Sequence, residues 1–163
     1  MSASHNNSEE KSLISSCSAG LPVSHNGKSR LAPAVKALLD SGSGVPVCPE
    51  QLGGMSTPRE ICEISGGDGN DVLDGKARVV TRSGRDVTGE FLAGARRSLE
   101  VAREQGCHRA VFKARSPSCG CGFIYDGSFS GRFKPGDGVA AALLKRHGIE
   151  ILTDEEFTNQ EKV

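Results

Sequence analysis

Short apolar runs typical of strands alternate with helical patterns along this chain of 163 residues, and this alternation constrains the fold more than any other feature. Four runs have the length and apolar content of strands: Ser12–Ser16, Val45–Val47, Ala110–Lys113 and Glu150–Leu152. Apolar residues recur at helical spacing in three segments: Leu31–Leu39, Thr88–Gln105 and Val139–His147. Strands that alternate with helices favour an α/β fold. We therefore predict a single compact domain with a mostly parallel sheet flanked by helices.

The segments between these elements carry turn signals. Ser29 and Asp137 are candidate N-caps for the first and last predicted helices. We expect a long glycine-rich loop over Gln51–Gly75, an extended segment over Ala77–Thr81 and a hairpin-like piece over Phe123–Phe133. The stretch from Gly66 to Asp74 matches a calcium-binding repeat, but such repeats bind calcium only when stacked. A single copy predicts a structural turn whose carboxylates bind backbone amides.

We expect the two ends of the chain to lie outside the folded domain. We expect a disordered N-terminal tail over residues 1–11, a domain over residues 12–157 and a C-terminal tail over residues 158–163. The first residues lack the apolar segment of a secretory signal, and no apolar run approaches the roughly 20 residues of a membrane span. We therefore expect a cytoplasmic protein that does not associate with membranes.

The charge balance bears on the partners. The 20 basic and 20 acidic residues cancel, which argues against a stable complex with nucleic acid. The chain has no Trp and a single Tyr, so a broad stacking platform for single strands is not expected either. These features leave a small molecule as the expected partner.

Three of the six cysteines follow predicted strands, namely Cys17, Cys48 and Cys119. Ligand sites of open α/β sheets lie at the carboxyl ends of parallel strands, so we expect these thiols to converge at one edge. Cytoplasmic thiols stay reduced, which favours ligation or catalysis over disulfides. Spacing alone leaves a second interpretation equally open, because free cysteines are often simply buried.

The number and spacing of the thiols give only a weak indication of the metal group. No two cysteines are spaced as CxxC, so the usual signature of structural zinc is missing. Three thiolates can hold a 4Fe-4S cluster and leave one iron free to act as a Lewis acid. Cys121 competes with Cys119 as the third ligand, Cys107 is expected at the opposite rim, and Cys62 lies in the loop at a place that the sequence does not define.

Polar residues flank two of the candidate ligands. Glu50 follows Cys48 closely and could move protons in the same cavity, or it could be a surface glutamate. Ser116 and Ser118 precede Cys119, where their hydroxyls could bind a thiolate or a substrate, or could serve the turn around Pro117. We take Ser118 as a candidate substrate-binding residue. Three basic residues could offset the charge of a cluster, or could be surface charges: Arg59, Lys113 and Arg115.

Several motifs in the same order resemble those of the thiouracil desulfurase (TudS-like) family, long known as a domain of unknown function. They are Val45–Gly54, Gly66–Gly69 with Asp74–Ala77, Ser116–Gly120 and Tyr125–Gly131. The resemblance extends from about Leu13 to Leu152.

The resemblance implies a compact α/β domain with an oxygen-sensitive 4Fe-4S cluster on Cys17, Cys48 and Cys119. It also implies a desulfidase that converts thiouracil-type pyrimidines to uracil and hydrogen sulfide. By the same resemblance, Glu50 is the proton shuttle and Ser116 the catalytic hydroxyl of the pocket. We expect a non-redox reaction in which the substrate sulfur binds the open iron.

The chain also departs from the family pattern. It reads Ser15-Ser16-Cys17-Ser18 where the family usually has Ser-Ala-Cys-Leu, and His25 stands where an aromatic residue is common. Cys121 often corresponds to a serine, which leaves the third ligand open. Two alternatives remain: a non-catalytic iron–sulfur or zinc module that binds or senses, and a tRNA sulfur-modification enzyme. The lack of a Walker loop argues against the second.

Overall fold

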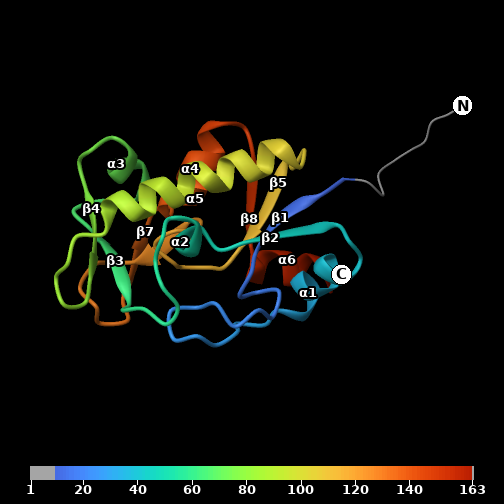
Figure 1. Ribbon diagram of the computed structural model, residues 1–163, viewed down its shortest axis with the longest axis horizontal. Coiled ribbons are helices and arrows are strands. Elements are labelled where there is room, and N and C mark those ends of the chain that lie inside the picture. The colour runs from blue at the N-terminus through green and yellow to red at the C-terminus, as the bar shows by residue number, and fades with distance from the viewer. Residues whose placement is uncertain (1–9, 163) are drawn as a thin grey trace, which may run out of the picture.

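A four-stranded parallel sheet forms the centre of the computed structural model, which describes residues 10–162 (Figure 1). Its strands lie side by side in the order β2 (Gly44–Val47), β1 (Ser12–Ser15), β5 (Arg109–Phe112) and β8 (Glu150–Thr153). Every neighbouring pair is parallel, with Ser15 opposite Val47 and Ile14 opposite Val111. The predicted α/β class with a mostly parallel sheet is confirmed.

Helices cover both faces of the sheet, so its central strands are apolar on both sides. Leu13 and Ala110 are fully buried against α4 (Thr88–Glu104) and α5 (Val139–Arg146). On the other face, Ile14 and Val111 are fully buried beneath α1 (Pro33–Asp40) and α6 (Asp154–Glu161). Figure 1 shows these two helix layers on opposite sides of the strands.

Two antiparallel hairpins adjoin the sheet. One pairs β3 (Cys62–Ser65) with β4 (Arg78–Thr81), and the other pairs β6 (Phe123–Tyr125) with β7 (Phe133–Pro135). The second confirms the predicted hairpin. The predicted loop over Gln51–Gly75 is wrong in part, because it contains β3, the second half of the short helix α2 (Pro49–Leu52) and α3 (Gly69–Leu73). These elements are four or five residues long, too short to show a period in the sequence.

The three predicted helices are confirmed, but the N-caps predicted for the first and the last of them, Ser29 and Asp137, are wrong. Helix α1 starts with Pro33 after Ala32 and has no side-chain cap, because proline needs no partner for its nitrogen. Gly138 caps α5, while Asp137 instead accepts a hydrogen bond from the Gly122 amide at 2.8 Å and pairs with Lys145 at 3.0 Å.

Helix α6 has no counterpart among the predicted elements. Its helical period is hard to recognise in the sequence because the helix buries few apolar side chains, among them Phe157. Its capping box of Thr153 and Glu156, however, is a sequence signal that could have revealed it. The helix extends into the segment expected to form a C-terminal tail, while most of the expected N-terminal tail, residues 1–9, lies outside the described residues. None of the helices over residues 10–162 combines the length and apolarity needed to cross a bilayer.

The calcium-like stretch forms the start of helix α3 rather than the predicted turn, but its carboxylates bind backbone amides as predicted. Asp68 caps α3 by accepting a hydrogen bond from the Asp71 amide at 3.2 Å. The Asp71 carboxylate accepts one in return from the Asp68 amide at 2.9 Å. The two carboxylates are therefore used by the backbone.

A pair of glycines lets α2 approach α4 closely. A side chain on Gly94 would overlap the carbonyl oxygen of Pro49, and one on Gly53 would overlap that of Glu90. This contact fixes the short helix that Cys48 caps. Close packing of backbone on backbone leaves no room for relaxation, so added volume must displace one of the helices.

We expect Gly94→Ala to lower the free energy of unfolding by about 1–3 kcal/mol, because the new methyl group pushes α2 away from α4. Gly89→Ala is the matched control. It lies in the same helix with nothing within 4 Å of the added methyl group, so it should be neutral or stabilising. Urea unfolding followed by circular dichroism measures both. An equal effect of the two variants would contradict the close contact.

Candidate functional site

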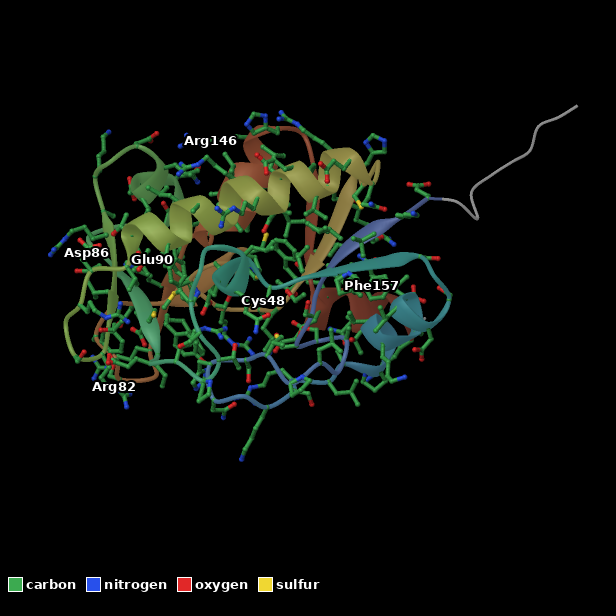
Figure 2. The ribbon with its side chains drawn as sticks, in the orientation of Figure 1. Cys48, Arg82, Asp86, Glu90, Arg146 and Phe157 are labelled. Carbon is green, nitrogen blue, oxygen red and sulfur yellow. The ribbon has the colours of Figure 1, made fainter. Side chains whose placement is uncertain are left out.

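A cavity of about 300 Å³ opens at the carboxyl ends of β1, β2 and β5. Cys17 follows β1, Cys48 follows β2 and caps α2, and Cys119 lies in the loop after β5. All three line this cavity, so the strand ends bring together thiols that are far apart in the sequence. Figure 2 shows Cys48 near the middle of the molecule, next to α2 and among crowded side chains.

Burial disfavours the charged form of all three thiols. It raises the pKa of Cys17 to about 11, with a further contribution from the nearby Cys48. Burial also raises the pKa of Cys48, and it raises that of Cys119 far above the ordinary value of a thiol. Thiolates at these positions therefore need a strong local positive charge, which a bound metal group supplies.

The spread of the thiols bears on the kind of metal group. Within the part of the chain that the structure describes, no three His, Cys, Asp or Glu side chains are grouped closely enough to hold a single metal ion. A structural zinc ion needs four ligands at about 2.0–2.3 Å. In an iron–sulfur cluster the thiolates bind separate iron atoms, so they lie farther apart. Three thiols around one cavity are a donor set that an iron–sulfur cluster can use.

The other three cysteines occupy different surroundings. Cys62 also lines the cavity, at the start of β3, and burial raises its pKa to about 12. Cys107 is buried next to the end of α4, outside the cavity, at the rim opposite the site. Cys121 lies outside the cavity too, beside Lys145 and Asp137, which makes it a poor substitute for Cys119.

Glu50 lies inside the cavity in the first turn of α2, so it is not a surface residue. Its Oε1 accepts a hydrogen bond from Nε of Arg59 at 2.7 Å, and its Oε2 accepts one from Oγ of Ser118 at 3.0 Å. The side chains of Arg59 and Glu50 are 5% and 12% exposed, respectively. The sequence names both residues, but it gives no signal that they pair with each other.

The two serines have different partners. Oγ of Ser116 accepts a hydrogen bond from the Cys119 amide at 2.7 Å, so it orders the turn that carries the thiol. It also lies 3.4 Å from Oγ of Ser118. Because Ser118 donates to Glu50, these hydroxyls form a chain from Ser116 through Ser118 to the carboxylate. Ser118 also lies 3.7 Å from Sγ of Cys119.

Two of the basic residues in the cavity are paired with acids from the start of α6. Nζ of Lys113 lies 3.5 Å from Asp154, and Arg115 forms an ion pair with Glu155. Lys113 still lies close enough to Cys17 to lower the pKa of that thiol, which partly offsets the effect of burial. The charge of Lys113 thus acts both on Asp154 at the start of α6 and on the Cys17 thiol in the cavity.

The far wall of the cavity contains residues that sequence reasoning missed. The buried Glu63 accepts hydrogen bonds from the amides of Gly127 and Phe129 at 2.9 and 3.0 Å, which holds the loop between β6 and β7. Phe129 has a φ of 57°, and Arg82 lies 5.9 Å from the centre of its ring. Glu63 lies between Cys62 and Ile64 in β3, and nothing in the sequence indicates that it anchors this loop.

Comparison with known proteins agrees with this geometry. The family described as 2-thiouracil desulfurase matches residues 13–156. Protein YbbK of Bacillus subtilis (strain 168) is 46% identical over 147 residues, which cover 90% of this chain and 97% of that protein. A solved structure of the [4Fe-4S]-dependent thiouracil desulfidase TudS matches with a TM-score of 0.79 at 38% identity, over 94% of this chain and 99% of that one. The chain therefore belongs to the 2-thiouracil desulfurase family.

Proposed function

We propose that this protein is a desulfidase that removes sulfur from thiouracil-type pyrimidines and gives uracil and hydrogen sulfide. The observation that carries the proposal is the cavity lined by three thiols from three strand ends, of which Cys119 is buried and Cys17 and Cys48 are half-buried, together with the hydrogen-bonded pair of Glu50 and Ser118. The likeness to the [4Fe-4S]-dependent thiouracil desulfidase TudS over 94% of this chain supports the same chemistry here.

We infer that Cys17, Cys48 and Cys119 hold a 4Fe-4S cluster. Their burial and their spread around one cavity support this donor set, and the position of Cys121 outside the cavity argues against its replacing Cys119. When bound, such a cluster supplies an iron atom without a protein ligand, which polarises a carbon–sulfur bond as a Lewis acid. The cavity volume of about 300 Å³ supports a small-molecule substrate.

The protein's own residues carry the protons. The overall reaction exchanges the sulfur of the thiocarbonyl for the oxygen of water, and no electrons are gained or lost. Glu50 accepts a proton from the attacking water through Ser118 and Ser116, whose hydroxyls form the observed chain. The same carboxyl group then returns a proton to the departing sulfide. Ser118 also contacts the bound pyrimidine, and Ser116 keeps the Cys119 turn in place.

The two alternatives have less support. A zinc module would need ligands grouped around one ion, and the described residues offer no such group. A tRNA sulfur-modification enzyme would need a basic surface, whereas the chain carries no net charge. A cytoplasmic location and the lack of a stable nucleic-acid complex stay predictions.

The test is an anaerobic reaction of the reconstituted protein with 2-thiouracil, with and without dithionite. We expect uracil and sulfide in equal amounts, formed at the same rate in both samples. Chromatography measures uracil and a colorimetric assay measures sulfide. Strict dependence on the reductant would contradict the non-redox reaction, and the absence of uracil in both samples would contradict the proposed activity.

A further inference from the structure

We propose that Arg59 is a positioning residue that fixes the carboxylate of Glu50 for proton transfer in the desulfuration reaction. The proposal rests on the proposed function, because it gives a role to a residue beside the proposed proton carrier. Arg59 follows the turn after α2 and points back into the cavity. Its side chain is 5% exposed, so water cannot replace the contacts that it makes.

The guanidinium group uses each of its nitrogens. Nε donates to Oε1 of Glu50 at 2.7 Å. Nη1 donates to the carbonyl of Ser56 at 3.2 Å and to Oγ1 of Thr57 at 2.9 Å. Nη2 donates to the carbonyl of Val23 at 3.1 Å and lies 3.7 Å from Sγ of Cys48. Because the group is planar and rigid, these contacts leave it a single orientation.

In this orientation the two oxygens of Glu50 have different hydrogen-bond partners. Oε1 is held by Arg59, while Oε2 is left to accept the hydrogen bond from Ser118. The same guanidinium touches Cys48, so it sets the carboxylate and a proposed cluster ligand at a fixed separation. Proton transfer requires such placement, since small errors in position lower rates steeply.

A purely structural role is the competing explanation. Through Ser56, Thr57 and Val23, Arg59 ties the turn after α2 to the loop after β1. Loss of these contacts could slow the enzyme by loosening the cavity as a whole. The effect would then not depend on Glu50, and it would add to the effect of a substitution at Glu50. Non-additivity therefore separates the two explanations.

The experiment compares Arg59→Ala, Glu50→Gln and the double variant, each reconstituted anaerobically and assayed with 2-thiouracil. We expect Arg59→Ala to lower kcat by about 10²-fold with little change in KM. The double variant should be no slower than Glu50→Gln alone, and added guanidinium should restore part of the activity of Arg59→Ala. Multiplying effects on kcat, or no rescue by guanidinium, would overturn the proposal.

Two further variants separate a loss of positioning from a loss of folding. Arg59→Lys keeps the charge but cannot reproduce the planar contacts, so it should also lower kcat, and wild-type kcat in this variant would overturn the proposal. Arg146→Ala is the matched control. It removes another arginine, one that pairs with Asp74 at 3.1 Å outside the cavity, and it should keep wild-type kcat.

A measurement without catalysis separates this proposal from the proposed function. In the cluster-free protein, Arg59→Ala and Glu50→Gln should each lower Tm, and the double variant should lower it by less than the sum of the two. Additive Tm changes would overturn the contact even if the enzyme is active. If the wild-type protein releases no uracil while the Tm changes are non-additive, the proposed function fails and the positioning of Glu50 by Arg59 stands.

Discussion

Replacing Cys17, Cys48 or Cys119 with alanine is expected to abolish both iron binding and uracil release. Each variant removes one of three thiols that reach the cavity from separate strand ends. The fourth thiol of the cavity, Cys62, interacts with Glu50 and Arg59 rather than with these three, so we do not expect it to take their place. The loss should exceed the roughly 10–100-fold that removal of a supporting hydrogen bond costs at a metal site. Iron and sulfide analysis of the reconstituted variants, together with the uracil assay, measures it.

Cys121→Ala is the matched control for the third ligand. Its side chain lies beside Lys145 and Asp137, outside the cavity, so iron content and activity should stay close to those of the wild-type protein. Cys62→Ala tests the remaining thiol of the cavity, and it should keep its iron because Cys62 interacts with Arg59 and Glu50 rather than with the other three thiols. Full activity of Cys119→Ala together with loss of activity in Cys121→Ala would show that Cys121, and not Cys119, is the third ligand.

Glu50→Gln should retain the cluster but lower kcat by about 10²–10⁴-fold, the usual contribution of a general acid or base. The amide keeps the size of the side chain but cannot accept and return a proton. Both oxygens of Glu50 already have partners, so the variant changes chemistry without opening space. Steady-state kinetics on protein with matched iron content measures the effect.

Ser118→Ala extends this prediction to the proton path. Removal of its hydroxyl interrupts the chain between Ser116 and Glu50, so kcat should fall, while the fold and the iron content are kept. A Glu50→Gln variant with wild-type kcat would contradict the assigned role. So would a loss of activity that follows iron content alone.

The convergence of the thiols could be predicted because it depends on a general rule of sheet geometry. Parallel strands share one edge for their carboxyl ends, so residues that follow such strands meet there. The sheet order places β2, β1 and β5 side by side, and the cysteines that follow these strands line one cavity. The central strands β1 and β5 have clear apolar patterns because helices bury them on both faces, whereas in the edge strand β2 only Val47 is buried.

The polar contacts of the site could not be predicted in the same way. Ser118 and Glu50 are 68 residues apart, and the hydrogen bond between them depends on how the loop after β5 packs against α2. The pairing of Arg59 with Glu50 depends on a turn within the segment that the sequence describes only as glycine-rich. Short elements such as β3 and α3 are fixed by tertiary contacts rather than by a pattern of their own.

The role of Glu63 could not be predicted for the same reason. Its position in β3 gives no reason to expect that it anchors the loop around Phe129, whose amide donates to its carboxylate at 3.0 Å. The family motif around Tyr125–Gly131 identifies the loop but not what holds it. Such contacts between distant loops are visible only once the fold has brought them together.

The most direct test of the central claim is an anaerobic absorption spectrum with iron and sulfide counts, taken before and after addition of 2-thiouracil. We expect about four iron and four sulfide ions per chain in the reconstituted wild-type protein, as the cluster type requires. We also expect that 2-thiouracil changes the spectrum while uracil does so much less. Bound zinc in place of iron, or a four-iron spectrum that 2-thiouracil leaves unchanged, would contradict the central claim.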